Sequence, residues 1–286
     1  EEHLRGNRLM APKSESASAK QAEQSKKDGN LYFNKKRYGA AIDAYTEAIA
    51  LCPNVPVYLT NRALCHRMRS DWQRMEEDCR KAIQLNHSCV KAHYLLGFAL
   101  LRKDKYGEGI RELEKALDLG RGENCMVEEI WTELAKAKYA EWDAEYARRS
   151  WEWQILREDC EAALKEKYIL DTSQIEGFID ESYGYYMKNI KGLSEVFARA
   201  AEADRPTEVP DHLCCRITLD LLRDPVITPR GVTYERRAIL EHLQKLGSFD
   251  PISREPLDEA DLIPNLALKE AVQAFLDQHG WAYKRD

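Results

Sequence analysis

Apolar side chains between residues 124 and 204 return at three- and four-residue spacing, with one polar interruption near residues 171–177. The segment is rich in Glu, Lys, Arg and Ala and contains no Pro, so we expect it to be almost entirely helical. Two helical arms around one polar break predict an antiparallel, coiled-coil-like helical hairpin. The positions that follow the spacing are Trp153, Leu156, Cys160, Ala163 and Leu170, then Tyr183, Tyr186, Ile190, Leu193 and Phe197.

The expected hairpin also carries many aromatic side chains. Four of the six tryptophans of the chain lie in its first arm, and we interpret them as packing residues rather than a cofactor site. Because a lone hairpin cannot bury both of its faces, we expect a second copy to cover it, which makes the protein a homodimer. We assign residues 124–205 to this dimerisation region. Residues 205–210 are expected to form a hinge, since each Pro favours extended backbone in the residue before it.

A period of 34 residues marks the first part of the chain. Gly29, Ala63 and Gly97 are spaced by this interval, which is that of the tetratricopeptide repeat. Residues 22–123 therefore resemble three such repeats, starting at residues 22, 56 and 90, and the resemblance implies a helical solenoid with a concave groove. The first repeat matches the family at Gly29, Tyr32, Ala41, Tyr45, Ala48 and Pro53.

Polar side chains at matching positions of these repeats are expected to face the groove. Lys26 and Asn30 share one face of the first helix because they are four residues apart, and Asn61 and Lys91 take the facing positions in the next two repeats. Two ammonium and two amide groups that converge form a receptor for carboxylates. The set resembles the carboxylate clamp of co-chaperones, which implies binding of the acidic Glu-Glu-Val-Asp tail of cytosolic heat-shock chaperones.

Three further residues are expected at this groove. Related clamps often carry an Arg four residues after the second Lys, where this chain has Leu95. Apolar contact of the tail with Tyr94 and Leu95 is therefore expected to replace part of the charge. Glu129 falls near the position of an acidic groove residue in related proteins. A single Lys or Asn on a polar helix is more often solvated surface, so the four matching positions together favour the clamp.

Short apolar runs and turn residues alternate after residue 206. Residues 226–228 and 232–234 flank a Pro-Arg-Gly turn and predict a β-hairpin. Residues 238–246 have helical periodicity, and Asn265 is expected to cap a helix that runs to about Gln278. A hairpin, a helix, a long loop and a closing helix follow one another in the order of a RING finger.

The metal ligands of a RING finger are missing from this region. A RING finger binds two zinc ions with eight Cys or His ligands, whereas residues 210–286 contain only five such residues and no Cys-x-x-Cys pair. We therefore expect no metal and no other cofactor. A RING-like arrangement without ligands resembles the U-box, a small α+β domain whose loops are held by hydrogen bonds and packing, and we assign residues 206–286 to it. The five residues are His212, Cys214, Cys215, His242 and His279.

The U-box resemblance implies a docking surface for a ubiquitin-conjugating enzyme. Ile217 and Leu219 lie in the first loop and Pro251 in the second, where the family forms a shallow apolar platform. Relatives often have Phe in place of Leu219, which bears on affinity and enzyme choice. Arg254 stands where related domains use a basic side chain to bridge the conjugating enzyme and its ubiquitin. The alternatives are ordinary core packing for Ile217 and Pro251 and a plain exposed side chain for Arg254.

Composition adds limits on partners and location. A net charge of −6 and an isoelectric point of about 5.8 argue against a nucleic-acid partner. The eight cysteines are scattered, as expected for buried reduced thiols, and no apolar signal segment or bilayer-spanning run is found. We therefore expect a cytoplasmic protein. Because the sequence does not open on Met, residues 1–21 are expected to be a disordered or non-native tail on a fragment.

The three regions in this order resemble the chaperone-associated U-box ubiquitin ligases, over essentially the whole chain after residue 22. The resemblance implies that ubiquitin passes from a conjugating-enzyme cysteine to a chaperone or its misfolded client, while the ligase supplies proximity and no nucleophile. A co-chaperone adaptor without ligase activity is the alternative, and it would not need Ile217, Pro251 and Arg254 together. A thioester-forming ligase would need an activated cysteine, for which Cys214 beside Arg216 is a weak candidate.

Overall fold

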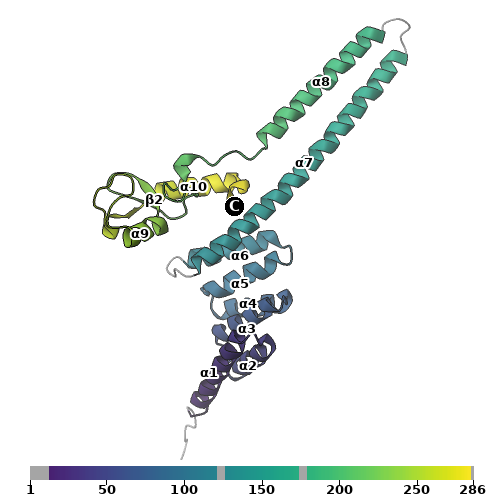
Figure 1. Ribbon diagram of the computed structural model, residues 1–286. Helices are drawn as coiled ribbons and strands as arrows, with labels where there is room; N and C mark the ends of the chain where they lie inside the picture. The colour runs from purple at the N-terminus through teal and green to yellow at the C-terminus, as the bar shows by residue number, and fades with distance from the viewer. Residues whose placement is uncertain (1–12, 121–125, 174–178, 285–286) are drawn as a thin grey trace, which may run out of the picture. The chain divides into compact units, whose positions relative to one another are not determined.

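The computed structural model describes residues 13–120, 126–173 and 179–284 of the chain (Figure 1). Two compact units are present, Glu1–Lys138 and Tyr139–Asp286, and the boundary between them falls inside the long helix α7 (Val127–Ser173). Across the described ranges, no helix combines the length and the apolar character that crossing a membrane requires. The described residues are mostly helical, as the sequence predicts, with one small sheet near the C-terminus.

Three helical hairpins follow one another in the first unit. Helix α1 (Lys13–Asn34) packs against α2 (Tyr38–Leu51), α3 (Pro56–Met68) against α4 (Trp72–Leu85), and α5 (Val90–Leu101) against α6 (Tyr106–Leu119). Helices α3 and α5 begin at Pro56 and Val90, where the sequence period places the starts of the second and third repeats. The stack of hairpins in Figure 1 is a tetratricopeptide solenoid, which confirms that prediction.

The turn inside each hairpin repeats with the same period as the helices. Lys36, Ser70 and Asp104 lie 34 residues apart and have φ angles of 58°, 57° and 58°. A left-handed residue just after a helix lets the next N–H groups turn back and satisfy the last helical carbonyls. The bonds run from Arg37 N to Tyr32 O, from Asp71 N to His66 O and from Lys105 N to Leu100 O.

Close helix approach explains the small residues of the period. A Cβ atom on Gly29 would lie 2.6 Å from the ring of Tyr45, and one on Gly97 would lie 2.8 Å from the side chain of Leu113. Real Cβ atoms essentially never come this close, so a side chain at either position would force the neighbouring helix or ring to shift, and glycine allows the close crossing. The first part of α7 continues this core, because its buried Ile130 packs with the residues of the third repeat.

The second unit contains the predicted helical hairpin. The later part of α7 runs antiparallel to α8 (Ile179–Ala203), as Figure 1 shows. The ring of Tyr168 stacks on that of Tyr186 with centroids 5.0 Å apart, and Arg149 Nη2 lies 3.1 Å from Asp204 Oδ1. The two helices are thus joined near both ends. Most of the expected polar break falls at residues 174–178, which lie outside the described residues.

The same unit ends in a small α+β domain. Strand β1 (Pro225–Ile227) pairs antiparallel with β2 (Thr233–Glu235) and with β3 (Ile263–Pro264), in the order β2-β1-β3. Helix α9 (Arg236–Lys245) follows β2, and α10 (Leu266–Gln278) is capped by Asn265, whose Oδ1 accepts from Leu268 N at 3.1 Å as predicted. Three short 3₁₀ turns complete the domain: η1 (Asp211–Leu213), η2 (Glu259–Asp261) and η3 (Gly280–Tyr283).

Two expectations about the ends of elements need correction. Helix α1 begins at Lys13, so residues 13–21 are helical rather than part of a disordered tail, while residues 1–12 lie outside the described residues. The β-hairpin has a third strand that the sequence did not predict. At two residues, one of them proline, β3 is too short to show the alternation by which strands are recognised.

Candidate functional site

Three of the four predicted clamp residues are in direct contact in the solenoid. Lys91 Nζ on α5 donates to Asn61 Oδ1 on α3 at 2.9 Å, and Asn61 Nδ2 donates to Asn30 Oδ1 on α1 at 3.4 Å. Residues that are 30 and 31 positions apart in the sequence are thus joined across the first helices of the three repeats. The structure places them as the period of the sequence predicts.

The fourth residue, Lys26, lies one turn before Asn30 on the same helix. Its ammonium group is 2.6 Å from the carboxylate of Glu23, and the Lys26 side chain is 24% exposed. An ion pair at this degree of exposure is weak, so a ligand carboxylate competes with Glu23 at little cost. Lys26 is therefore close to the other three through its place on α1 rather than through a contact with them.

The electrostatic setting of Lys91 favours an anionic ligand. Burial lowers the pKa of Lys91, and the neighbouring thiols of Cys89, Cys65 and Cys79 act in the opposite direction. Burial also raises the pKa of Cys65 to about 11, so that thiol is neutral near pH 7 and offers no counter-charge. No carboxylate among the described residues forms an ion pair with Lys91. A partly desolvated ammonium group without an internal counter-ion is a strong site for a carboxylate from outside.

A pocket of the first unit brings together Tyr94 and Glu129, two of the three further groove predictions. Its volume is about 340 Å³, and its other lining residues are Arg67, Glu128, Thr132 and Glu133. Arg67 Nη1 donates to the Tyr94 hydroxyl at 3.2 Å, and its guanidinium carbon lies 4.1 Å from the centroid of the Phe98 ring. No pattern in the sequence marked Arg67, which supplies a positive charge at the wall of the pocket.

Leu95 corrects the expectation of apolar contact with a bound tail. Its side chain is 1% exposed and belongs to the main core of the solenoid. The reason is that α5 is covered by α3, α4 and α6, so most of its positions are internal. Leu95 therefore does not replace the arginine of related clamps as a ligand contact. The charged residues of this neighbourhood that the sequence did not mark are Arg67, Glu128 and Glu133.

The two predicted docking loops of the C-terminal domain have the same backbone. Loop 1 (residues 215–220) and loop 2 (residues 250–255) each contain a residue at φ 62°, Leu219 in the first and Arg254 in the second. In each loop the N–H group of the first residue donates to the carbonyl of the sixth residue, and the N–H group of the fifth residue donates to the carbonyl of the first. The bonds are Cys215 N to Asp220 O (2.7 Å), Leu219 N to Cys215 O (2.9 Å), Asp250 N to Glu255 O (2.8 Å) and Arg254 N to Asp250 O (2.9 Å).

The first side chain of each loop holds it in place. Asp250 Oδ1 accepts from Ile252 N at 2.8 Å, from Ser253 N at 2.9 Å and from the Tyr234 hydroxyl at 2.9 Å. Cys215 Sγ accepts from Ile217 N at 3.4 Å in the same way. Side-chain acceptors thus fix both loops, and no group of three or more potential metal ligands gathers in the described parts of the chain.

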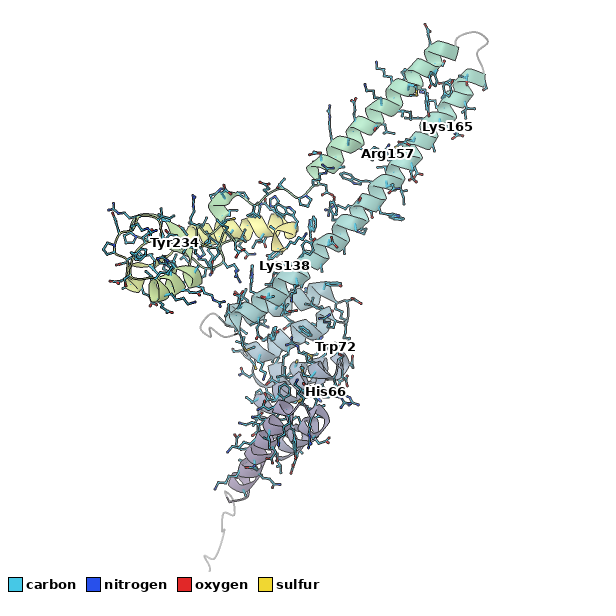
Figure 2. The ribbon with its side chains drawn as sticks, in the orientation of Figure 1. His66, Trp72, Lys138, Arg157, Lys165 and Tyr234 are labelled. Atoms are coloured by element: carbon cyan, nitrogen blue, oxygen red, sulfur yellow. The ribbon has the colours of Figure 1, made fainter. Side chains whose placement is uncertain are left out.

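Asp250 is ionised although it is 2% exposed. Burial acts to raise its pKa, but hydrogen bonds from Ser253 N, Ile252 N and the Tyr234 hydroxyl outweigh burial, and the pKa lies below its usual value. Burial and the bond to Asp250 raise the pKa of Tyr234, labelled in Figure 2, so its hydroxyl remains a donor. A buried, charge-assisted pair therefore ties loop 2 to β2.

A second carboxylate supports the region after loop 1. Glu235 Oε2 accepts from Arg223 N at 2.8 Å and from Asp224 N at 3.0 Å, and Arg236 Nε donates to Asp224 Oδ2 at 2.7 Å. Arg230 and Glu255 form a further ion pair that links the β-hairpin turn to loop 2. No spacing in the sequence identified these pairs, because their partners lie 11 to 25 residues apart.

The side chains predicted to dock a conjugating enzyme project from these fixed loops. Leu219 is 78% exposed and Ile217 is 37% exposed, while Pro251 is half-buried. Core packing is therefore not the role of Ile217. Arg254 is exposed, with its guanidinium carbon 5.3 Å from the centroid of the Phe249 ring. Ile252, which is 57% exposed, was not singled out from the sequence and adds to the apolar surface.

Cys214 does not have the environment of an activated nucleophile. Burial raises its pKa, and the carboxylates of Asp211 and Asp220 raise it further. A thioester-forming cysteine needs a lowered pKa, usually from a nearby positive charge. The surroundings of Cys214 therefore contradict the thioester alternative.

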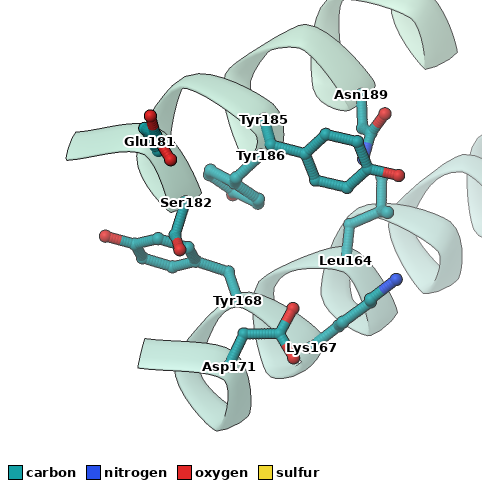
Figure 3. A pocket seen from close by; sticks show the side chains of 9 residues that line it. All are labelled: Leu164, Lys167, Tyr168, Asp171, Glu181, Ser182, Tyr185, Tyr186 and Asn189. Carbon is teal, nitrogen blue, oxygen red and sulfur yellow. The ribbon is translucent and has the colours of Figure 1, made fainter. Parts of the chain in front are cut away.

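The helical hairpin has an open apolar surface and a hollow between its two helices. The hollow has a volume of about 230 Å³ and lies between Lys167 and Tyr168 of α7 and Tyr185 and Tyr186 of α8 (Figure 3). Figure 3 shows the rings of Tyr168 and Tyr186 turned toward each other across it. The large apolar side chains left more than half exposed on the hairpin are Trp151, Leu156, Ile169, Leu170, Tyr183, Tyr185 and Val196.

Comparisons with known proteins agree with these regions. Residues 209–281 match the U-box domain family, and residues 29–55 match the tetratricopeptide repeat family. The E3 ubiquitin-protein ligase CHIP of Arabidopsis thaliana is 62% identical over 266 residues, which cover 92% of this chain and 96% of that protein. The E3 ubiquitin-protein ligase PUB24 of the same plant is 36% identical over 73 residues, or 25% of this chain and 16% of its own.

A solved structure is similar to part of the chain. It is the first tetratricopeptide domain of Spaghetti (RPAP3) bound to the HSP90 peptide SRMEEVD. Its sequence identity is 33%, with 43% of this chain and 94% of that chain covered and a TM-score of 0.40.

Proposed function

The chain belongs to the family of the E3 ubiquitin-protein ligase CHIP, and from this premise we propose how its parts divide the work. The groove of the repeats binds the acidic C-terminal tail of cytosolic heat-shock chaperones, and the U-box recruits a ubiquitin-conjugating enzyme. As a U-box ligase the protein is a ubiquitin transferase that forms no covalent intermediate of its own. It brings the charged conjugating enzyme close to lysines of the chaperone or of its misfolded client, and proximity lowers the barrier to transfer.

The observation that carries the chaperone-binding part is the row of contacts from Lys91 through Asn61 to Asn30. This row joins three repeats and ends at the Lys91 ammonium group, which has no ion-pair partner among the described residues. Lys26 contributes a second positive charge one turn away on α1. We assign the terminal carboxylates of the tail to these four residues. Tyr94 and Glu129 are further proposed tail contacts. The pocket that they line contains Glu128, Glu129 and Glu133 against the single Arg67, so it suits uncharged or basic residues of the tail rather than its acidic ones.

On the U-box, the platform for the conjugating enzyme comprises Ile217, Leu219 and Pro251, extended by Ile252. The loops that carry these side chains are held by buried side-chain acceptors, so the apolar surface is already ordered before docking. Arg254 stands at the left-handed position of loop 2 with its guanidinium group exposed. Its proposed role is to bridge the conjugating enzyme and the ubiquitin attached to it.

A homodimer formed through the helical hairpin is part of this proposal. The support is the set of large apolar side chains left exposed on α7 and α8, which a second copy of the hairpin would cover. Residues 22–123 act as the chaperone-binding domain, 124–205 as the dimerisation region and 206–286 as the U-box. A cytoplasmic location follows from the proposed chaperone partners. The adaptor alternative without ligase activity loses its support, because the identity with a ligase extends over 92% of the chain.

A reconstituted reaction tests the two functions separately. Purified protein, ubiquitin, activating enzyme and a panel of conjugating enzymes are mixed with a chaperone that has a free tail, or with one that lacks it. Ubiquitination of the tailed chaperone is expected, and Lys91→Ala should abolish it while free ubiquitin chains still form. Ile217→Ala should stop both reactions and leave tail binding intact.

A tail peptide with an amidated C-terminus provides the sharper control for the groove. Amidation removes the terminal charge, so binding should weaken about as much as it does in Lys26→Ala or Lys91→Ala. Equal binding of the free and amidated peptides by the unaltered protein would exclude a carboxylate clamp.

A further inference from the structure

The contacts of Lys91 determine how the two asparagine amides of the groove are turned. An ammonium group only donates hydrogen bonds, so the atom of Asn61 that it meets at 2.9 Å must be the carbonyl oxygen Oδ1. The amide nitrogen of Asn61 then faces Asn30, where it donates to Oδ1 at 3.4 Å. The oxygen of the Asn30 amide consequently faces the interior of the solenoid. Its Nδ2 group, which has two donors, lies on the opposite side of the same exposed side chain.

The Asn30 oxygen accepts a second hydrogen bond, from helix α2. The hydroxyl of Tyr45 on α2 lies 2.7 Å from Asn30 Oδ1, which makes it the shorter of the two bonds to this atom. Because Oδ1 can only accept, the tyrosine must donate. Burial raises the pKa of Tyr45 to about 12, so the donating proton is present throughout the physiological range.

The place of the tyrosine ring is fixed by packing. Tyr45 is 2% exposed, and its ring lies directly on Gly29, where an added Cβ would come within 2.6 Å of the ring. The absence of a side chain at Gly29 lets the ring reach along α1 until its hydroxyl meets the next residue, Asn30. A rigid ring with two side-chain torsions positions its terminal hydroxyl more accurately than a long flexible side chain.

We propose that Tyr45 is a positioning residue for carboxylate binding: its hydroxyl holds the Asn30 oxygen inward, so that the Asn30 N–H groups point into the groove toward the terminal carboxylate of the ligand. The inference rests on the proposed carboxylate-binding function of the groove. Without this bond the Asn30 amide is held only by the longer contact to Asn61. A half-turn of the amide would then present its oxygen to the ligand carboxylate, and two acceptors repel each other.

The test compares variants of the full-length chain by titration calorimetry, with a peptide ending in Glu-Glu-Val-Asp as probe. Tyr45→Phe keeps the ring on Gly29 and removes only the hydroxyl. Tyr38→Phe is the matched control, because it also removes one hydroxyl from the first repeat and retains the ring contact with Phe33, whose centroid is 5.5 Å away. We expect Tyr45→Phe to weaken binding of the free-acid peptide by about three- to tenfold, the range for one lost hydrogen bond. Tyr38→Phe should change it by less than about twofold.

Two further readouts separate positioning from a general loosening of the repeat. The amidated peptide has lost the terminal carboxylate, so its weaker affinity, measured by competition, should be the same in Tyr45→Phe and in the unaltered protein. In the Asn30→Ala background, Tyr45→Phe should have no further effect, because the hydroxyl acts only through the Asn30 amide.

Each outcome decides the proposal. It is overturned if Tyr45→Phe weakens the free and amidated peptides by the same factor, if its effect multiplies with that of Asn30→Ala, or if Tyr38→Phe behaves in the same way. If Asn30→Ala itself leaves binding of the free-acid peptide unchanged, the clamp assignment fails, and the role of Tyr45 fails with it. If Asn30→Ala loses binding and Tyr45→Phe binds fully, the clamp assignment is supported and only the positioning role of Tyr45 is rejected.

Discussion

Replacement of Asp250 by alanine should release loop 2 of the U-box. The carboxylate of Asp250 is the common acceptor for the Tyr234 hydroxyl, which is fully buried, and for the backbone N–H groups of Ile252 and Ser253. A buried donor left without an acceptor costs about 1–3 kcal/mol, and a partly exposed one costs less because water replaces the acceptor. The three lost bonds together amount to about 3–5 kcal/mol. This is a large part of the stability of about 5–15 kcal/mol that is typical of a domain.

A graded series makes the reasoning quantitative. Tyr234→Phe removes one of the three donors and no acceptor, so it should cost about 1 kcal/mol. Asp250→Asn keeps an oxygen in the same place but loses the charge, and it should fall between Tyr234→Phe and Asp250→Ala. Because the pKa of Asp250 is lowered in the folded state, its contribution is present above the unfolded pKa of about 3.9 and is lost as the pH falls through the lower folded value.

Hydrogen–deuterium exchange on the full-length protein would measure the effect where it occurs. In the unaltered chain, the N–H groups of Asp250 and Arg254 bond within loop 2 and should be protected. Asp250→Ala should abolish this protection and slow ubiquitin discharge from the conjugating enzyme, while loop 1 and tail-peptide binding stay unchanged. The reasoning is refuted if loop 2 exchanges at the original rate in Asp250→Ala, or if Tyr234→Phe is the more destabilising change.

Three other outcomes are expected. Because burial lowers the pKa of Lys91 below 10.5, affinity for a free-acid tail peptide should decline as the pH rises toward that value. Lys91→Arg keeps its charge and should flatten this pH profile. Calorimetry across alkaline pH would check this, and the same pH profile in Lys91→Arg and the unaltered protein would contradict it. Arg254→Ala should slow single-turnover discharge of the charged conjugating enzyme with little change in its binding, since the bridging contact matters mainly in the transition state; a proportional loss of both would make Arg254 an ordinary docking residue. Chelators should leave ligase activity and thermal unfolding unaffected, and zinc found at one or two ions per chain by atomic spectroscopy would argue against loops held by Asp250 and Cys215 alone.

Spacing along the chain determined most of the architecture. The interval of 34 residues predicts the start of α3 at Pro56 and of α5 at Val90, because each repeat is a local pair of helices whose small residues mark their own crossing. Asn265 was recognisable as a helix cap because the bond it makes spans only three residues. The contacts among Asn30, Asn61 and Lys91 could be predicted in the same way, since residues at equal positions of stacked repeats become neighbours.

Only the tertiary structure decided which of these side chains are buried and which groups they bond to. The acceptors that stand in for metal ligands in the U-box join residues 2 to 20 positions apart, and a single Asp or Cys in a loop shows no such partnership in the sequence. Leu95 is equally apolar in an exposed and in a buried setting, and it is the neighbouring helices that place it in the core. The contact of Tyr45 with Asn30 likewise depends on the angle at which α2 crosses Gly29. Local periodicity thus determines which elements form, whereas burial and the direction of a hydrogen bond depend on groups brought together only when those elements pack.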